Sequence, residues 1–569
     1  MTSVSRHVYT ARTDLGAELS LRSGRITLDA GSIPHVTASL TLAVEDVALL
    51  DELDPRGSRR ITVGATRQGH MDGSGEWVPE GFREFDLGIR STTPNRADGT
   101  VSVELASDEA LLADFAQLDE DITPRSLESS LRDVVEYALG KIGAVLQPGA
   151  LDADVTAFWP VSLLNSNPAG ITNTAGYWTG TGASALTSVV VNSPAPALGN
   201  RTVRWTAAAG SSAVGVAGWD GTSSTKEGRV TPGRRYGTVV RMLSNPGRST
   251  TITMGFRDEN GRHFSSVTSP AQVTSIGAWT EFYLNAEAPP GAAYAYVSVT
   301  TVGNSSGQNH WVQAILYEGR WRIPMFYGDS AGGGYTYAWS GDPNASPSKR
   351  TPVLERDPES LVWPAGVSAM DFLHPVLLMT GTRLVCDEGR LFSLRDEDYR
   401  AAGSQSWRYG VNITAADEKL SRDDETWFDA AVYLYTWTDA DGIEQSRVDA
   451  YSLTGSPTKV LRVELRNTPY PGPGRAQHVV QRAQGKGREV TVTGIPSWAE
   501  QTDQPLSIIL DGTPVQTGIS ARIRFDLDTD SVSVTTRTTD TPAFAWELLP
   551  ADEAWLDSPP GASWIGEVI

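Results

Sequence analysis

Cysteine is nearly absent from this chain, with a single residue, Cys386, among 569. One thiol excludes an internal disulfide framework and any metal site that is built on several thiolates. The remaining role for such a residue is that of a small apolar side chain, so we expect Cys386 to be buried.

Long apolar runs are also missing. No stretch approaches the roughly 20 apolar residues that cross a bilayer. Residues 1–13 have no apolar segment behind their basic residues, which a secretory signal peptide requires. We therefore expect neither a membrane span nor a signal peptide.

The motifs that mark common catalytic sites are absent as well. The seven histidines are scattered, with no pair at helical i, i+4 spacing and no H-E-x-x-H. There is no G-x-S-x-G nucleophile turn and no G-x-x-x-x-G-K-[ST] phosphate loop. We expect a protein that is not an enzyme and that has no cofactor and no catalytic metal.

Negative charge is plentiful but unevenly distributed. The chain has 47 Lys and Arg against 68 Asp and Glu, a net charge of −21, which repels phosphate backbones and argues against direct nucleic-acid recognition. Residues 1–155 carry −12 and residues 351–569 carry −14, whereas residues 156–350 carry +5 and hold 8 of the 17 tryptophans. A middle segment whose charge and composition differ from those of both flanking segments predicts an inserted domain.

The length indicates three or four domains, at about 150 residues per domain. The outer thirds contain period-two alternations typical of half-buried antiparallel strands, as in Ala38–Val44 and Thr100–Leu105. Two helices interrupt them. An apolar stripe after Thr123-Pro124 predicts a helix over residues 124–142, and a capping box of Ser368 with Asp371 predicts a second over 369–380.

The middle segment is predicted to be an all-β sandwich. Short strand patterns recur every 8–12 residues with turn residues between them, and no helical pattern intervenes. The predicted strands are Thr202–Thr206, Tyr236–Leu243, Thr251–Phe256, Thr280–Leu284, Ala292–Val299 and Trp311–Leu316.

Several short sequence motifs of this segment resemble those of a known module family. Leu163–Pro168, Ala278–Thr280, Ala288–Ala292 and Trp311–Gly319 occur in the order found in carbohydrate-binding β-sandwiches related to xylanase and laminarinase modules. The resemblance implies a jelly-roll fold and binding of a sugar polymer.

The sequence around the insert resembles a second family. Met325–Ser330 and Tyr337–Ser346 are similar to phrases that close such modules in minor tail proteins of phages infecting actinobacteria. Asp423–Val432, Tyr435–Gly442 and Asn467–Gly474 resemble the second half of phage tail-hub, or baseplate-hub, proteins.

The two resemblances together imply a mainly β protein in which hub-type β-barrel and α+β domains are interrupted by the sandwich. Residues 1–158 and 351–569 would form the hub, and residues 159–350 the insert. The implied partners are further copies in a homotrimer, distal-tail and other tail-tip proteins, the tape-measure protein and host surface polysaccharide. The implied location is the distal end of the tail in the virion.

Two alternatives stay open. One is a distal-tail ring subunit, hexameric, with the same kind of insert. The other is a wall-polysaccharide-degrading enzyme, for which Glu281 or Glu318 would supply a carboxylate.

Sugar recognition depends on aromatic faces and planar polar side chains, and the sandwich offers several. Tyr294 and Tyr296 share one side of a strand whose other side carries Ala293, Ala295 and Val297, so the tyrosines are predicted to face outward. Packing within the sandwich is the alternative for each aromatic residue. The candidate glycan-binding residues are Arg204, Trp219, Arg257, Tyr294, Tyr296, Trp311 and Gln313.

Overall fold

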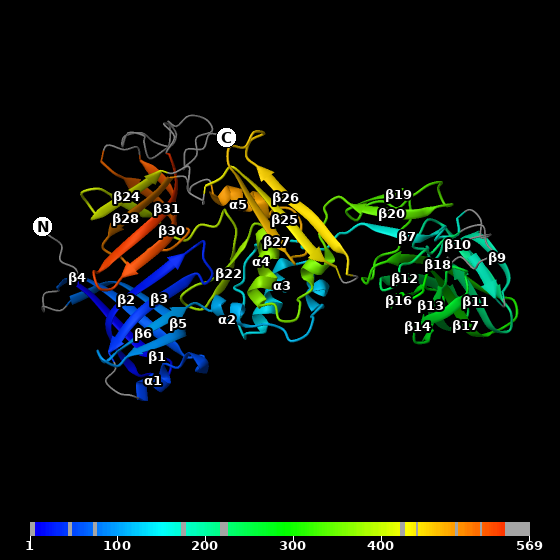
Figure 1. The fold of residues 1–569 in the computed structure, drawn as a ribbon, viewed down its shortest axis with the longest axis horizontal. Coiled ribbons are helices and arrows are strands. Elements are labelled where there is room, and N and C mark those ends of the chain that lie inside the picture. Colours follow the sequence, from blue (N-terminus) through cyan, green and yellow to red (C-terminus); the bar gives the residue numbers. More distant parts are fainter. Residues whose placement is uncertain are drawn as a thin grey trace. The chain divides into compact units, whose positions relative to one another are not determined.

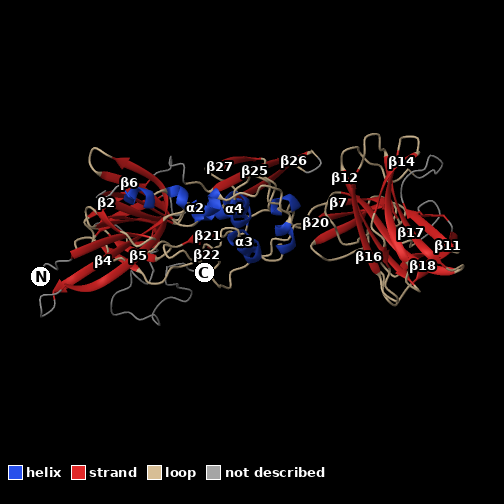
Figure 2. Cartoon of the chain, turned by 90° about the horizontal axis from the view of Figure 1, so that it is seen from below, coloured by secondary structure: helices blue, strands red, loops and turns tan. Residues whose placement is uncertain are grey.

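The computed structural model describes residues 6–43, 48–71, 77–171, 178–181, 183–216, 226–420, 427–439, 442–483, 488–511 and 515–540. The chain divides into two compact units. Unit 1 comprises Met1–Ala157, Pro358–Trp437 and Ser446–Ile569, and unit 2 comprises Phe158–Asp357 and Thr438–Gln445. Strands dominate both units, as Figure 2 shows, which confirms the predicted mainly β fold class.

The amino-terminal strands of unit 1 form a six-stranded barrel. The strand order is β1-β4-β5-β6-β3-β2, and β1 pairs with β2 to close the ring. The strands are β1 (Arg6–Thr13), β2 (Glu18–Asp29), β3 (Val36–Ala43), β4 (Arg60–Met71), β5 (Trp77–Asn95) and β6 (Thr100–Ala106), with α1 (Ala48–Glu52) and the 3-10 turn η1 (Pro55–Gly57) between β3 and β4.

Six strands from the last third of the chain continue the same sheet. Ile26 of β2 pairs with Phe525 of β30, and Figure 1 shows these amino- and carboxy-terminal strands side by side. Both residues belong to one core in which inward-facing Val, Ile, Leu and Phe side chains alternate along the strands. The added strands are β23 (Gln405–Arg408), β24 (Ala415–Leu420), β28 (Arg488–Gly494), β29 (Pro505–Ile509), β30 (Gln516–Asp526) and β31 (Ser531–Asp540).

A helical layer with its own core completes the middle of unit 1, and Figure 2 shows its helices grouped together. Trp363 is fully buried in this core and stacks on Phe372 with ring centroids 5.1 Å apart. The elements are α2 (Glu109–Asp114), the 3-10 turns η2 (Thr123–Leu127) and η3 (Pro358–Leu361), α3 (Leu131–Gly140), α4 (Ala369–Met379), β21 (Arg383–Cys386) and β22 (Phe392–Arg395).

The predicted helix over residues 124–142 is not continuous, which corrects that prediction. Thr123–Leu127 form a 3-10 turn, and the α-helix starts only at Leu131. Ser130 has extended backbone angles and accepts a hydrogen bond from the backbone N–H of Asp133, so it is the N-cap. The apolar stripe spans both pieces because Leu127 packs against the same core as the helix.

The second helix begins as its capping box predicts. Ser368 accepts a hydrogen bond from the backbone N–H of Asp371, and its own hydroxyl donates to the Asp371 carboxylate. The strand β21 that follows ends at Cys386, which is fully buried as expected. Burial and the neighbouring Glu109 carboxyl raise the pKa of the Cys386 thiol, so the thiolate is disfavoured.

A three-stranded sheet covered by one helix forms a further part of unit 1, except that Thr438–Gln445, at the β25–β26 turn, belong to unit 2. Its strands are ordered β26-β25-β27, with β25 and β27 parallel. Tyr435 and Tyr470 pack edge to face at 5.3 Å in the core between sheet and helix. The elements are β25 (Ala430–Thr438), β26 (Glu444–Ser452), β27 (Val460–Arg466) and α5 (Arg475–Ala483).

Unit 2 is a sandwich of two antiparallel sheets. The eight-stranded sheet has the order β16-β12-β18-β7-β20-β19, with β10 joining β18 to β9, and the six-stranded sheet has the order β14-β13-β17-β11-β8, with β15 on β13. The strands are β7 (Val161–Ser166), β8 (Trp178–Thr181), β9 (Ala183–Val190), β10 (Arg201–Ala207), β11 (Gly210–Val216), β12 (Arg235–Ser244), β13 (Ser249–Arg257), β14 (His263–Thr268), β15 (Gln272–Val273), β16 (Thr280–Glu287), β17 (Tyr294–Asn304), β18 (Gln308–Glu318), β19 (Tyr335–Trp339) and β20 (Pro347–Pro352).

The six strands that the sequence predicts here overlap β10, β12, β13, β16, β17 and β18. Alternate residues of both sheets meet in one core, to which β18 contributes Val312, Ala314 and Leu316. The other side of β18 therefore faces outward, and part of it is covered: Ile315 and Tyr317 pack under the segment around Phe326.

Candidate functional site

The predicted glycan-binding residues lie on two opposite faces of the sandwich. Arg204 on β10 and Trp311 and Gln313 on β18 are on the outer side of the eight-stranded sheet. Arg257, Tyr294 and Tyr296 lie in β13 and β17 of the six-stranded sheet. Trp219 lies outside the described residues. The predicted set therefore does not form one site.

Gln313 is not available to a ligand, which corrects its assignment. Its side chain is fully buried. The amide nitrogen donates to the carbonyl oxygens of Leu198 (2.8 Å) and Arg201 (2.9 Å), and the amide oxygen accepts from the N–H of Leu198 (3.1 Å). Gln313 thus fixes the chain just before β10 on the outer face of the sheet.

Tyr294 is also removed from the candidate set. Only 2% of its surface is exposed, and the Arg229 guanidinium lies over its ring at 5.9 Å. The prediction that Tyr294 points away from the side of β17 that carries Ala295 is correct. Other residues nevertheless cover the Tyr294 ring on that outer side.

Tyr296 is half-buried and its ring is enclosed. A side-chain carbon added at Gly255 would lie 2.3 Å from the Tyr296 ring, so the ring lies flat on the backbone of β13. The Arg257 guanidinium stands over the same ring at 4.6 Å, and His263 packs against its edge at 5.9 Å. This face therefore presents a cation rather than a free aromatic surface.

A different arrangement occurs around Trp311, which is half-buried. Trp311 pairs across the sheet with Arg204 on one side and with Leu243 on the other. One step along, Arg241 pairs with Glu281 of β16. We call these five residues the Trp311 surface. Directly paired residues on one face of a sheet lie about 5 Å apart, so the ring has a cation beside it and a second cation diagonally across.

Described residues neutralise the charges of the Trp311 surface only in part. Glu281 forms an ion pair with Arg322 and lies 3.8 Å from the Nε atom of Arg241. The Nε–H of Arg204 is buried, and no described residue accepts a hydrogen bond from it. A buried donor of this kind gains free energy when a ligand supplies an acceptor. An aromatic ring beside planar cationic donors suits a hydroxyl- or carboxylate-bearing sugar.

A buried and uncharged histidine lies behind this surface. His310 is fully buried, bonded to Ser244 (2.8 Å) and Asn304 (3.0 Å), and its ring packs on Trp205 at 4.8 Å. Burial lowers the pKa of His310 to about 4, so the imidazole is neutral near pH 7.

The two carboxylates considered for hydrolysis do not form a catalytic pair. Glu281 and Gln313 both pair with Arg241, so they lie at the same position along the strand direction. Glu318 lies five residues after Gln313 in β18. At about 3.3 Å per residue, the two are roughly 16 Å apart along the strand direction. Glycosidase carboxyl groups are about 5–9.5 Å apart. Glu318 instead pairs with Arg234 at 2.7 Å.

Sequence reasoning missed that Arg241 and Leu243 lie near Trp311 and that Glu281 lies beside Arg241. The alternation of β12 places Arg241 and Leu243 on one face, but the pairing of β12 with β18 has no local signal.

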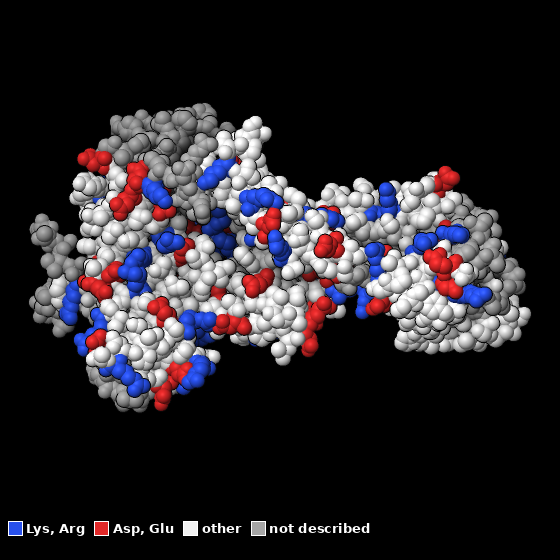
Figure 3. All heavy atoms as spheres, in the orientation of Figure 1, with Lys and Arg blue, Asp and Glu red and all other residues white. Residues whose placement is uncertain are grey.

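Figure 3 shows Lys and Arg interspersed with Asp and Glu over the visible face of each unit. Within the described ranges, no group of three or more His, Cys, Asp or Glu side chains could hold a metal ion, and no helix is long and apolar enough to cross a membrane.

No protein-family model matches the chain, and no curated protein matches it in sequence. Similar solved structures exist for the whole chain and for part of it. The 43 kDa tail protein of prophage MuSo2 from Shewanella oneidensis is 10% identical, with a TM-score of 0.38 over 94% of this chain and 98% of that one. The tail protein from Neisseria meningitidis MC58 is 8% identical, with a TM-score of 0.36 over 94% and 96%. The carboxy-terminal family 22 carbohydrate-binding module of Clostridium thermocellum Xyn10B is 15% identical, with a TM-score of 0.21 over 27% and 90%. The chain is thus similar along its length to phage tail proteins and over about a quarter to a carbohydrate-binding module.

Proposed function

We propose that this chain is a structural minor tail protein of a siphophage, in which unit 1 forms the hub at the distal tip of the tail and unit 2 binds a glycan on the host surface. The tail assignment is supported by the phrases around the insert that resemble actinobacterial phage tail-hub proteins. The protein acts by assembly and binding rather than by catalysis. It is part of the virion.

The proposed hub is a homotrimer. Unit 1 carries two sets of six strands joined through β2 and β30, so three copies place six such sets around one axis. Distal-tail proteins, other tail-tip proteins and the tape-measure protein are the proposed neighbours. The alternative, a hexameric distal-tail ring with the same insert, differs in copy number.

Copy number at the tail tip tests this assembly. We expect a symmetric reconstruction of the virion by electron cryomicroscopy to contain three copies of the chain in a ring at the distal end. Six copies would favour the distal-tail alternative. A chain found only in the capsid would contradict both.

The observation that carries the glycan proposal is the Trp311 surface, because it combines a half-buried aromatic ring with a buried guanidinium donor that has no acceptor among the described residues. The ligand is proposed to be a host-wall polysaccharide. The net +5 of residues 156–350 favours acidic polymers through long-range attraction.

Substitution of the tryptophan tests this site. Truncating an anchoring aromatic residue removes about 2 kcal/mol or more, so we expect Trp311→Ala in the full chain to bind host-wall polysaccharide at least roughly 30-fold more weakly. Arg204→Gln should weaken binding as well. Affinity electrophoresis in gels that contain the polysaccharide measures both.

Phe264→Ala is the matched control, since Phe264 is an exposed aromatic residue of β14 on the opposite sheet. It should bind as the wild type does. Loss of binding in Phe264→Ala with retention in Trp311→Ala would move the site to the six-stranded sheet. Failure of the wild-type chain to bind any host-wall polysaccharide would reject the glycan proposal.

A further inference from the structure

A cavity of about 420 Å³ lies within unit 1 and belongs to none of the surfaces above. Arg67 of β4 forms one side, and β23, the loop after it and the segment between β28 and β29 form the others. Its volume is within the range of small-ligand pockets. Amide and hydroxyl side chains are frequent in its wall, which includes Ser404, Gln405, Ser406, Asn412, Thr414 and Gln504. The cavity is therefore suited to a polar ligand.

Glu500 places a carboxylate in this wall, and only 5% of its surface is exposed. Its Oε1 atom accepts from the backbone N–H and from the hydroxyl of Ser497, both at 2.8 Å. Its Oε2 atom is buried, and no described residue donates a hydrogen bond to it. Buried polar atoms are nearly always hydrogen-bonded, so this oxygen points to a donor that comes from outside the chain.

The described cations near Glu500 have other carboxylate partners. Arg67, which lines the same cavity, pairs with Glu80 at 3.7 Å. Arg83 donates to the backbone oxygen of Glu500, but its ion pair is with Glu388 at 2.6 Å. Within the described ranges Glu500 forms no ion pair of its own. A cationic ligand would supply the counter-charge that a buried carboxylate requires.

The turn that carries Glu500 is held in place from several sides. Trp498 has a φ of +69°, a left-handed conformation that is rare for a bulky side chain. Its ring is 4% exposed and stacks on Phe525 with centroids 4.6 Å apart. Packing therefore maintains the strained backbone, and the bonds between Glu500 and Ser497 close the turn. The carboxylate is positioned before any ligand binds.

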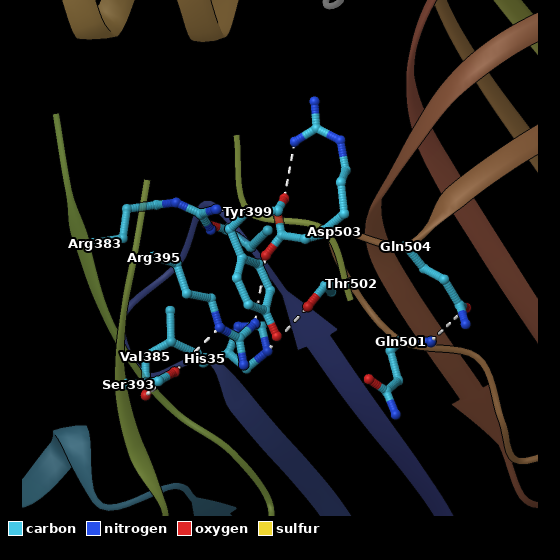
Figure 4. Close-up of polar contacts among 12 residues, drawn as sticks. His35, Arg383, Val385, Ser393, Arg395, Tyr399, Gln501, Thr502, Asp503 and Gln504 are labelled. Carbon is cyan, nitrogen blue, oxygen red and sulfur yellow. Dashed lines mark hydrogen bonds and ion pairs between the residues drawn. The ribbon is translucent and has the colours of Figure 1, made fainter. Parts of the chain in front are cut away.

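The amide groups of the wall are fixed as well. The side-chain oxygen of Gln504 accepts from the Gln405 amide (2.7 Å) and from the backbone N–H of Gln501 (3.2 Å; Figure 4). The Gln504 amide nitrogen donates to the carbonyl oxygen of Ala402 (2.7 Å), and the Gln405 oxygen accepts from the indole N–H of Trp407 (3.0 Å). Side chains that are already ordered lose little conformational entropy when a ligand binds.

Arg67 adds an unsatisfied group of the opposite polarity. Its Nε–H is buried and has no acceptor in the part of the chain that the structure describes. The wall thus carries one acceptor, on Glu500, and one donor, on Arg67, that need partners. The exposed hydroxyl side chains of Ser404 and Ser406 also line the cavity. A ligand that carries a cation together with hydroxyl groups meets all of these requirements.

We propose that this cavity binds an amino sugar, with its ammonium group on Glu500 and its hydroxyl groups on Arg67 and on the hydroxyl and amide side chains of the wall. A neutral sugar would leave the buried carboxylate without a counter-charge. An alkylammonium ion would leave the polar wall without partners. The site lies in unit 1 and is independent of the Trp311 surface in unit 2.

Glucosamine, glucose and butylamine are the probes that test the proposal. Saturation-transfer NMR on the full chain measures their dissociation constants at about pH 6, at which both amines are protonated. We expect glucosamine to bind at least roughly tenfold more tightly than glucose, which lacks the charge, and than butylamine, which lacks the hydroxyl groups. Either probe as tight as glucosamine, or no binding of glucosamine, would overturn the proposal.

Two variants locate the site. Glu500→Gln removes the charge but keeps the shape of the side chain and an acceptor for Ser497, and Ser404→Trp fills the cavity from an exposed position. We expect Glu500→Gln to weaken glucosamine binding at least roughly tenfold and Ser404→Trp to abolish it. Wild-type affinity in both variants would place glucosamine elsewhere and reject the site.

The matched controls are Glu464→Gln and Ser446→Trp, which change exposed residues of unit 1 outside the cavity. Both should bind glucosamine as the wild type does. Trp311→Ala should also retain wild-type affinity for glucosamine, since the cavity is in the other unit. Loss of glucosamine binding in Trp311→Ala would assign the binding to the Trp311 surface and contradict the cavity site.

Discussion

Replacing Asp503 with asparagine is expected to destabilise unit 1 by about 3–5 kcal/mol. The Asp503 side chain is 1% exposed and accepts from Arg383 and Arg395, whose side chains are each 11% exposed (Figure 4). Asparagine keeps the size of the side chain but removes its charge. Two buried guanidinium groups are then left without their shared counter-charge, which accounts for the magnitude.

Asparagine is the appropriate substitution because of the backbone. Asp503 has a φ of +60°, a left-handed conformation that asparagine tolerates far better than alanine does. Asp503→Asn therefore reports the loss of the ion pairs rather than new backbone strain. The pairs join the segment before β29 to the β21–β22 hairpin, so the loss affects packing between separate parts of the unit.

Urea unfolding measures this effect. The unit 1 transition should move to lower urea, while the unit 2 transition stays unchanged and serves as an internal reference. Glu464→Gln is the matched control, because Glu464 pairs with Arg462 at 2.7 Å on the surface, where such a pair contributes about 0–1 kcal/mol. Equal shifts in the two variants would contradict the role assigned to Asp503.

The second large effect is a dependence of stability on pH that originates at Glu109. This side chain is fully buried in α2 and accepts hydrogen bonds from the backbone N–H of Cys386 (2.7 Å) and the hydroxyl of Ser107. Burial raises the pKa of Glu109 from an ordinary 4.5 to about 7, although these hydrogen bonds oppose the shift. The folded protein therefore holds a proton that the unfolded chain has released.

The sign follows from proton linkage. Between about pH 4.5 and pH 7 the folded state binds more protons at Glu109 than the unfolded state does, so the free energy of unfolding falls as the pH rises. One pKa unit corresponds to about 1.4 kcal/mol, which gives a loss of about 3 kcal/mol across the window. The contribution is complete below pH 4.5 and lost above pH 7.

Glu109→Gln isolates this contribution, because glutamine has the shape of the protonated acid and does not titrate. We expect the unfolding free energy of the variant, minus that of the wild type, to grow by about 3 kcal/mol from pH 4.5 to pH 8. Other titrating groups cancel in this difference. Urea titrations at several pH values provide the measurement, and a difference that stays constant with pH would contradict the raised pKa.

Local sequence signals predicted the elements that depend on nearby residues. Period-two alternation located β10, β12 and β18, because the side chains of a strand alternate between core and surface wherever one face is buried. The Ser368–Asp371 capping box located the start of α4, because both partners lie within one turn. The same approach failed at residues 124–142, where an apolar stripe continues across a 3-10 turn and a helix that share one core.

In the candidate site, local sequence patterns do not predict which side chains are exposed. Trp311 and Gln313 are two residues apart on the same side of β18, and the sequence offers no reason to treat them differently. Gln313 is buried because the chain at Leu198 and Arg201 bonds to its amide, whereas Trp311 remains half-exposed beside Arg204. The difference comes from a segment more than 100 residues away.

The sequence by itself determined that the chain is mainly β, that its basic, tryptophan-rich middle differs from its acidic ends, and that its one cysteine is buried. These properties follow from composition and from alternation over a few residues. Tertiary structure alone decided that β2 pairs with β30, that the rings of Tyr294 and Tyr296 are covered, and that Arg383 and Arg395 share the Asp503 carboxylate. Each of these depends on segments brought together from distant parts of the chain, and such pairings are selected by the packing of whole faces rather than by any local pattern.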